Sequence, residues 1–278
     1  MVTPELSSDV VAQAGERLDR VVQARFPEVP RAGVLAAFAD GLVSIGGRVV
    51  AKGRRARAGD QLRVERLAEA ADFAACAEPG SLDVVYEDAV LLAFDKPGGQ
   101  NCHPLAPGET GTLVNAMLAR HPELVAVGGD SLMPALLHRI DAGTSGLVLA
   151  ARTDAAYAAL RRQFLEQTVT KTYLATVKGV LARGIGKQLR AGVELDDGPA
   201  RVDDFAVVDK VPGKTLVRLT LHEGRKRIVR RLLAAVGYPV QELVRTDIGP
   251  IALGNQRPGS LRVLDSKDVG ELYKAVGM

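Results

Sequence analysis

The chain has 278 residues, of which 47% are hydrophobic and 25% are charged. These values allow a sizeable core and are ordinary for a soluble protein. No apolar run reaches the roughly 18–20 residues of a membrane span, and the N-terminus lacks the basic start and apolar stretch of a signal peptide. Cys76 and Cys102 are too few for a disulfide framework or a zinc site. We therefore expect a cytoplasmic protein with no membrane partner and no bound metal.

The positive charge is concentrated in the N-terminal quarter. Residues 1–66 hold 11 Lys/Arg and 8 Asp/Glu, which accounts for the whole formal net charge of +3. The basic residues gather in two clusters, one made of Arg48, Lys52, Arg54, Arg55 and Arg57 and the other of Arg225, Lys226, Arg227, Arg230 and Arg231. Two such clusters favour a polyanionic partner, although two solvated faces explain the charge equally well.

Residues 15–66 read as one small unit. Apolar residues at helical spacing predict a helix from Leu18 that Pro27 ends, and a second helix is expected over 31–40 with Gly41 as its cap. Short strands are expected around 43–45 and 62–64, beside glycine turns. The alanine-rich stretch 67–80 shows no face that would pack on a partner, and we interpret it as a linker.

Beyond the linker, strands and helices follow without regular β-α-β alternation, which predicts an α+β domain over 81–278. The expected strands cover 82–86, 90–95, 147–151, 171–180, 205–208 and 216–221. The expected helices cover 112–121, 154–164 (with Thr153 as its cap) and 227–236 (ended by Gly237).

The segment H-R-I-D-A-G-T-S-G at 138–146 places Asp141 in a polar, glycine-containing loop directly before a buried strand. Loops held by rigid strands often carry catalytic groups. Asp141 could act as a nucleophile or a general base. Taken alone, the loop favours a simpler role, in which the Asp141 carboxylate accepts from nearby backbone N–H groups as a turn cap.

This segment resembles the H-R-[LI]-D-x-x-T-S-G motif of the RluA-type pseudouridine synthases. Three more segments match that family in the same order: F-D-K-P-G-G at 94–99, K-T-Y-L-A at 171–175, and the run from Gly224 through Arg230 to Arg245. The resemblance covers roughly residues 82–265. The run G-R-K-R-I-V-R-R also leans towards the related RsuA-type branch. The implied catalytic fold is a mixed, largely antiparallel sheet flanked by helices.

The N-terminal unit resembles the ribosomal-protein-S4-like RNA-binding domain. The matching features are Arg17-Leu18-Asp19, Arg31, the turn region 41–47 and Gly59-Asp60. The resemblance therefore implies three parts, namely a small α+β S4-like domain (1–66), a linker (67–80) and a pseudouridine synthase domain (81–278).

The resemblance implies an enzyme that isomerises uridine in RNA to its carbon-linked isomer, without metal or organic cofactor. Ribosomal RNA is the expected partner, of the large subunit first and the small subunit second, and the protein is expected to be a monomer. Asp141 would be the nucleophile, with Arg230 keeping it charged and Tyr173 stacking on the base. The simpler alternatives are a surface arginine for Arg230 and an ordinary core aromatic for Tyr173.

Further residues are expected at the RNA. Arg139 would fill the space that an extruded base leaves, and Leu232 or Leu233 would line the base pocket, unless they are core residues. Lys96 would contact phosphate, support the loop or simply be solvated. The remaining expected RNA contacts are Arg225, Lys226, Arg17, Arg31, Arg48, Lys52, Arg54 and Arg55.

Two departures from the family pattern concern side chains near the site. Ala142-Gly143 stands where many members carry charged residues, and Arg227-Ile228 replaces the usual His-Gln pair. Two other functions stay open on the sequence. One is a non-catalytic RNA-binding or ribosome-assembly protein on the same fold. The other is a hydrolase using Asp141 with His138 or His103, for which no serine elbow or paired carboxylates are present.

Overall fold

The computed structural model describes residues 8–11, 14–27, 29, 31–67, 74–128 and 130–254. The chain divides into two compact units, one of Met1–Cys76, Pro104–Glu109 and Asp130–Met133, and the other of Ala77–His103, Thr110–Gly129 and Pro134–Met278. The expected linker 67–80 spans this division, and its residues 68–73 lie outside the described residues. The three-part division stays a prediction. No helix of the described ranges is long and apolar enough to cross a membrane.

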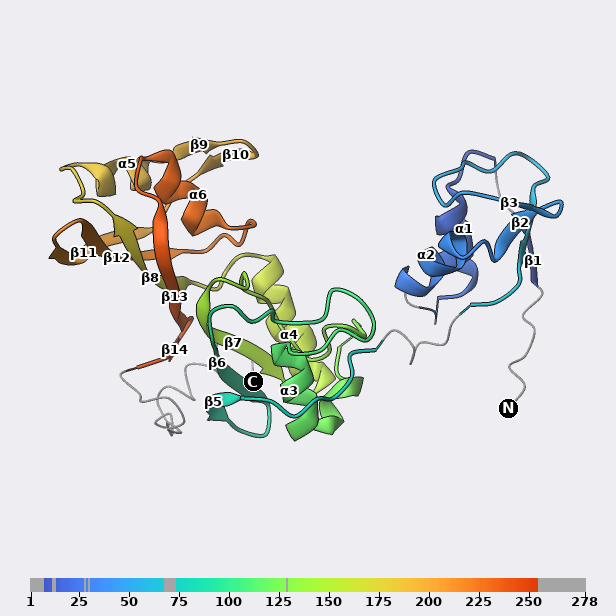
Figure 1. Cartoon of the computed structure of the whole chain (residues 1–278), viewed down its shortest axis with the longest axis horizontal. Helices are drawn as coiled ribbons and strands as arrows, with labels where there is room; N and C mark the ends of the chain where they lie inside the picture. Colours follow the sequence, from blue (N-terminus) through green and yellow to red (C-terminus); the bar gives the residue numbers. More distant parts are fainter. Residues whose placement is uncertain are drawn as a thin grey trace. The chain divides into compact units, whose positions relative to one another are not determined.

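The first unit has two helices and a four-stranded antiparallel sheet in the order β1-β4-β2-β3 (Figure 1). Its elements are β1 (Ser8–Val11), α1 (Leu18–Arg25), α2 (Arg31–Ala39), β2 (Val43–Ile45), β3 (Arg48–Val49) and β4 (Gln61–Val64). Leu18, Val22, Val43, Leu62 and Val64 are fully buried between helices and sheet. Both predicted helices and both predicted strands of this unit are confirmed.

The second unit is built on an eight-stranded, mostly antiparallel sheet. Its strand order is β11-β12-β8-β13-β7-β6-β5, and β14 pairs with β13 beside this path. In Figure 1, α3 and α4 accompany the β5–β7 half, while α5, α6 and the β9–β10 hairpin accompany the β8, β11 and β12 half. The mixed architecture with a largely antiparallel sheet confirms the predicted fold class.

The elements of this unit, in chain order, are β5 (Asp83–Glu87), β6 (Leu91–Lys96), α3 (Leu113–Arg120), the 3-10 helix η2 (Pro122–Ala126), β7 (Ser145–Ala151), α4 (Asp154–Leu165), β8 (Lys171–Lys178), α5 (Ile185–Ala191), β9 (Val193–Leu195), β10 (Gly198–Ala200), β11 (Asp204–Val211), β12 (Lys214–Leu221), α6 (Ile228–Ala235), β13 (Val240–Ile248) and β14 (Ile251–Ala252). All six predicted strands and all three predicted helices are present within a few residues of their expected bounds. The structure adds β9, β10, β13, β14 and α5, which the sequence did not reveal.

Helix starts follow local capping. The Thr153 hydroxyl accepts from the Ala156 N–H at 3.2 Å, which confirms the predicted cap of α4. Thr112 and Asn115 form a reciprocal capping box at the start of α3. By contrast, α6 begins after Arg227, which has a left-handed φ of 55° and makes no side-chain cap. At this start the Ile228 N–H donates to the Arg225 carbonyl oxygen at 3.1 Å.

The sheet register brings four sequence motifs onto one row. Across adjacent strands, Leu219 of β12 pairs with Tyr173 of β8, which also pairs with Arg245 of β13. Arg245 pairs with Gly146 of β7, and Gly146 pairs with Lys96 of β6. We call these four residues, Lys96, Gly146, Arg245 and Tyr173, the central row. The 138–146 loop enters the sheet at this row.

The step between β7 and β13 in the central row is the sheet's parallel pairing, recorded over Ser145–Gly146 against Val244–Arg245. A Cβ built on Gly146 would lie 2.2 Å from the Arg245 carbonyl oxygen, and the φ of Gly146 is +106°. A Cβ at this distance would overlap the carbonyl oxygen, and residues other than glycine rarely adopt a φ of this value. Glycine is therefore required where these two strands meet.

Lys171 begins the buried face of β8 and is itself 5% exposed. Its ammonium donates to the His222 carbonyl oxygen and lies 5.8 Å from the centroid of the Phe164 ring. Burial and, to a smaller extent, the neighbouring Arg245 guanidinium lower the pKa of Lys171 to about 8, against the opposite effect of Asp203 and Glu223. The fold thus bears a cost for holding this lysine charged at neutral pH.

The close approach at Gly146 predicts a stability loss. Gly146→Ala should lower the free energy of unfolding by roughly 2–5 kcal/mol, from backbone overlap and a disfavoured φ. Gly143→Ala is the matched control, because its added Cβ meets nothing nearer than Arg230 Nη2 at 3.9 Å. Urea unfolding measures both changes. Equal effects of the two substitutions would contradict the account.

The Lys171 pKa predicts a pH-dependent difference between the protein and Lys171→Met. Between pH 8 and pH 10.5 the unfolded lysine binds a proton that the folded one has released, so this group adds stability as the pH rises. Below pH 8 both states are protonated and the cost is fully present. The free energy of unfolding of the wild-type protein, relative to that of Lys171→Met, should therefore rise by about 2 kcal/mol between pH 7 and pH 10. Parallel denaturation curves at the two pH values would contradict this.

Candidate active site

Asp141 lies on the loop between His138 and β7, with its side chain half-buried. The Thr144 N–H donates to the Asp141 backbone carbonyl at 2.9 Å, which closes the turn. Within the described residues, no backbone N–H donates to the Asp141 carboxylate, as a turn cap would require. The turn is made by backbone alone, and the carboxylate remains available to a ligand.

Lys96 supports the Asp141 loop through hydrogen bonds to backbone carbonyl oxygens. Its side chain is fully buried, and its ammonium donates to the carbonyl oxygens of Pro97 and Gln100, both at 2.7 Å, and of Ala142 at 3.3 Å. Burial lowers the pKa of Lys96, and Asp141 is among the acidic groups that oppose this. Its three N–H groups serve three backbone oxygens, so contact with RNA would require them to be released, and that contact stays a prediction. The alternative of loop support is confirmed.

Arg230, on α6, holds the same loop from the other side. Its Nη2 donates to the Gly143 carbonyl at 2.7 Å and its Nη1 to the Val240 carbonyl at 3.3 Å. Burial and Arg227 lower the Arg230 pKa, while Asp141 raises it by favouring the charged guanidinium. In the described part of the chain Arg230 forms no ion pair within 4 Å of Asp141, so the guanidinium holds the loop's backbone rather than the carboxylate.

The departure at Ala142-Gly143 leaves the loop well supported. Both residues offer their carbonyl oxygens to cations, Ala142 to Lys96 and Gly143 to Arg230. The Gly99 N–H also donates to the Ala142 carbonyl at 2.7 Å. Backbone oxygens thus take the place of the side chains that the loop lacks.

Tyr173 is 8% exposed and belongs to the core cluster that covers the β8–β12 half of the sheet. Its position in the central row sets it beside Arg245, one strand away from the end of the Asp141 loop. In this structure Tyr173 packs as a core aromatic, which was the simpler alternative. Its stacking on a uracil stays a prediction.

Arg245 and His138 are further functional candidates; in the sequence Arg245 only closes the last family motif and His138 is named only in the hydrolase alternative. Arg245 is 2% exposed, and its Nε and Nη2 both donate to the Leu147 carbonyl, at 2.9 and 2.6 Å. Nη2 also lies 2.8 Å from His138 Nδ1, while the Leu149 N–H donates to His138 Nε2. The signal in the sequence was a charged residue at a buried position of an alternating strand.

His138 is held as the neutral imidazole. Burial, followed by the cations Arg245, Lys171 and Arg161, keeps the pKa of His138 well below its usual range. N–H donors lie at both ring nitrogens; the neutral imidazole can accept at one of them and the imidazolium at neither, so this geometry also disfavours protonation. His138 therefore orients Arg245 and cannot donate a proton to a substrate from this position.

The basic residues of the first unit divide into tied and free groups. Asp19 is 1% exposed and pairs with Arg17 at 2.9 Å and Arg31 at 3.3 Å. The pKa of Asp19 is lowered, chiefly by its hydrogen bond with Arg17. Arg54 pairs with Asp60 at 3.1 Å, and Arg55 donates to the Gly15 carbonyl at 2.7 Å. Arg48 and Lys52 are exposed and have no polar partner within the described ranges.

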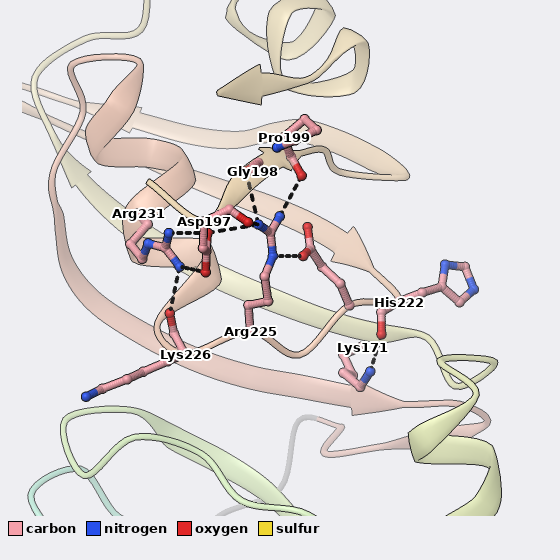
Figure 2. A network of polar contacts seen from close by, with 9 residues as sticks. Lys171, Asp197, Gly198, Pro199, His222, Arg225, Lys226 and Arg231 are labelled. Carbon is pink, nitrogen blue, oxygen red and sulfur yellow. Dashed lines mark hydrogen bonds and ion pairs between the residues drawn. The ribbon is translucent and has the colours of Figure 1, made fainter. Parts of the chain in front are cut away.

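Two residues of the second basic cluster contact Asp197 (Figure 2). Arg225 and Arg231 both pair with its carboxylate, at 2.9 and 2.5 Å. Lys226 is exposed, and its side chain points away from this network. Arg139 is exposed beside the Asp141 loop, with Nη1 3.2 Å from His103 Nε2.

Leu232 and Leu233 are fully buried in the core cluster of the β8–β12 half. This burial supports the simpler alternative, in which both leucines are core residues of α6. A pocket-lining role would require their side chains to become accessible.

The comparisons with known proteins identify one family. Residues 90–235 match the family model of RNA pseudouridylate synthases, and this range contains Lys96, Asp141, Tyr173 and Arg230. An uncharacterized RNA pseudouridine synthase of Mycobacterium tuberculosis is 46% identical over 244 residues, covering 86% of each chain. The ribosomal large subunit pseudouridine synthase D of Pseudomonas aeruginosa is 32% identical, covering 81% of this chain and 72% of that protein.

Among solved structures, a pseudouridylate synthase covers 92% of this chain and is covered to 99%, with 22% identity and a TM-score of 0.48. The argument for the family comes from the sequences, since the matched range takes in half of the chain and the identities extend over most of it. The chain therefore belongs to the RNA pseudouridylate synthase family, and it is an enzyme that isomerises uridine in RNA.

Proposed function

We propose that this chain modifies uridines of ribosomal RNA, with those of the large subunit as the first candidates and those of the small subunit as the second, and that Asp141 is its nucleophile. The observation that supports this most is that the backbone of the loop is held by hydrogen bonds while the Asp141 carboxylate is not. The backbone on the C-terminal side of Asp141 is fixed by Lys96 and Arg230, whereas the carboxylate accepts no backbone N–H in the described ranges. Fixed backbone with a free reactive group is the arrangement that a covalent catalyst needs.

In the proposed reaction the Asp141 carboxylate attacks the bound nucleotide. The glycosidic C–N bond breaks, the uracil turns and a carbon–carbon bond to the ribose forms, and the bond to Asp141 is broken again before the product leaves. The hydrogen at ring position five is released to water, and the ring nitrogen that left the ribose takes up a proton. Lys96 and Arg230 hold cationic charge near Asp141, whose carboxylate favours the charged form of both and so opposes the lowering of their pKa by burial. Tyr173 would stack on the base, and neutral His138 would keep Arg245 in place.

The target base must leave its stack before Asp141 can reach it, which costs a few kcal/mol. Arg139 is suited to fill the vacated space, because it is exposed on the same loop two residues before Asp141. Its guanidinium is held near His103, so it is oriented before RNA arrives. A pre-oriented side chain loses less conformational entropy on binding than a free one.

The first unit is proposed to be the S4-like RNA-binding domain, working in a monomeric cytoplasmic enzyme. Its support is the excess of positive charge in 1–66 and the exposure of Arg48 and Lys52. The ribosomal target is supported by the relative from Pseudomonas aeruginosa, whose name specifies the large ribosomal subunit. No cofactor enters this proposal, because the carboxylate and the RNA supply all the reacting groups.

The nucleophile is tested by tritium release from unmodified ribosomal RNA transcripts labelled with [5-3H]uridine. Asp141→Asn keeps the shape but removes the charge, and it should lower the release rate by more than about a thousandfold, as loss of a covalent nucleophile does. Asp209→Asn, an exposed carboxylate on the edge strand β11, is the matched control and should leave the rate unchanged. Retained release by Asp141→Asn would sink the assignment.

The RNA-binding role of the first unit is tested through salt dependence. Replacing Arg48 and Lys52 by glutamine should weaken RNA binding and make the plot of log K against log[salt] less steep by about two, since two phosphate contacts are lost. Lys210→Gln with Lys214→Gln removes the same charge from the exposed β11–β12 hairpin and serves as the control. Equal slopes for the two double variants would argue against contact by this unit.

A further inference from the structure

The β9–β10 hairpin carries an acidic turn, Asp196-Asp197, that reaches the basic cluster around α6. Asp197 receives two guanidinium groups, as Figure 2 shows. Arg231 donates to Oδ2 at 2.9 Å and to Oδ1 through its second nitrogen, which is a two-point contact, and Arg225 donates to Oδ1 at 2.9 Å. Exposed single ion pairs contribute little, but a forked arginine contact within a network is the exception.

Arg225 makes further hydrogen bonds besides its contact with Asp197. Its Nε donates to Glu223 at 2.6 Å, its Nη2 to the Pro199 carbonyl at 2.7 Å, and its Nη1 also to the Gly198 carbonyl at 3.1 Å. Every nitrogen of the guanidinium is therefore in use. Contact with an RNA phosphate would require several of these bonds to break.

The two arginines lie at the two points that fix α6. Arg225 is in the segment between β12 and the helix, and Arg231 is in the helix's first turn, next to Arg230. The helix entry itself has a left-handed residue, Arg227, and no side-chain cap. Asp197 thus supplies from outside the anchor that the helix lacks at its own start, and Arg230 reaches Gly143 from the anchored helix.

We propose that Asp197 is a positioning residue for the isomerisation. Its carboxylate pairs with Arg225 and Arg231, so that these two cations are not available to RNA. The same contacts fix α6, so that Arg230 holds the Asp141 loop. Lys226 and Arg227, which are exposed between the two tied arginines, are left to meet phosphate. This inference rests on the proposed roles of Asp141 and Arg230, and it corrects the sequence prediction that Arg225 contacts RNA.

The proposal predicts effects of opposite sign on chemistry and on binding. Without the Asp197 charge, α6 loses its anchor and the reacting groups are misplaced, which slows the chemical step. The same change frees Arg231, whose acidic partner is Asp197, while Glu223 and two backbone carbonyls still hold Arg225. One freed cation strengthens RNA binding and its salt dependence. A residue with only a structural role would weaken both when removed.

The test compares Asp197→Asn with Asp196→Asn in the full chain. Asp196 is the matched control, since it is an exposed neighbour in the same turn with no hydrogen bond or ion pair recorded for it in the described ranges. Single-turnover tritium release is measured at saturating labelled large-subunit ribosomal RNA, and affinity is measured from 50 to 200 mM salt. For Asp197→Asn we expect a rate about tenfold lower, with higher affinity and a salt slope steeper by about one. Asp196→Asn should match the wild-type rate.

Arg231→Gln is the second variant, in case Asp197→Asn folds poorly. It breaks the same contact from the other side, so its rate should fall to a similar extent, but without a steeper salt slope. The double variant should be no slower than either single variant, because the two residues form one contact. Weaker RNA binding by Asp197→Asn with an unchanged rate, or an equal loss in Asp196→Asn, would overturn the proposal. An inactive wild-type protein would instead refute the proposed function.

Discussion

The close contact between β7 and β13 at Gly146 is the constraint on which the rest of the second unit depends. Here the backbone of Gly146 meets the Arg245 backbone at a distance that excludes any Cβ. The contact joins the half of the sheet that carries Lys96 to the half that carries Tyr173. Because the 138–146 loop enters β7 at this step, the position of Asp141 is determined by the sheet and not by the loop's own side chains.

Around this contact the fold accepts buried positive charge. Lys96, Lys171 and Arg245 are all less than 6% exposed, and Arg245 lowers the pKa of both lysines. Backbone carbonyls rather than carboxylates satisfy most of these N–H groups. Buried charge of this kind is costly, and hydrogen bonds to backbone oxygens offset only part of the cost. The result is a site in which the loop backbone is held rigidly while the carboxylate of Asp141 stays unneutralised by direct pairing.

Much of the fold could be predicted from the sequence because apolar periodicity is strong in the outer elements. The strands at 82–86, 90–95 and 216–221 and the capped helix after Thr153 are examples. Strand β13 was not predicted, although it lies at the centre of the sheet. Its sequence, V-Q-E-L-V-R-T-D-I, places Arg245 where an apolar residue would be expected, and the partners of that arginine come from residues about 100 positions earlier.

The candidate site shows the same division. Motif spacing was enough to select Asp141, Tyr173 and Arg230, because the order of four segments is a property of the sequence alone. It could not assign Lys96, whose role depends on its burial beneath Ala142, a residue 46 positions away. Nor could it foresee that the loop's missing side chains would be replaced by carbonyl oxygens.

A count of charges along the sequence also could not predict which basic residues are available to RNA. The cluster at 225–231 holds five cations, and a count treats them as one RNA-binding surface. In the structure they face three directions. Arg225 and Arg231 pair with Asp197, and Arg225 pairs with Glu223 as well. Arg230 faces the Asp141 loop, whereas Lys226 and Arg227 are exposed and have no acidic partner within 4 Å among the described residues. Whether a cation of a basic run is available to a polyanion therefore depends on the carboxylates that lie near it in the fold. In this chain that carboxylate belongs to a hairpin almost thirty residues earlier, whose sequence gives no sign of its partners.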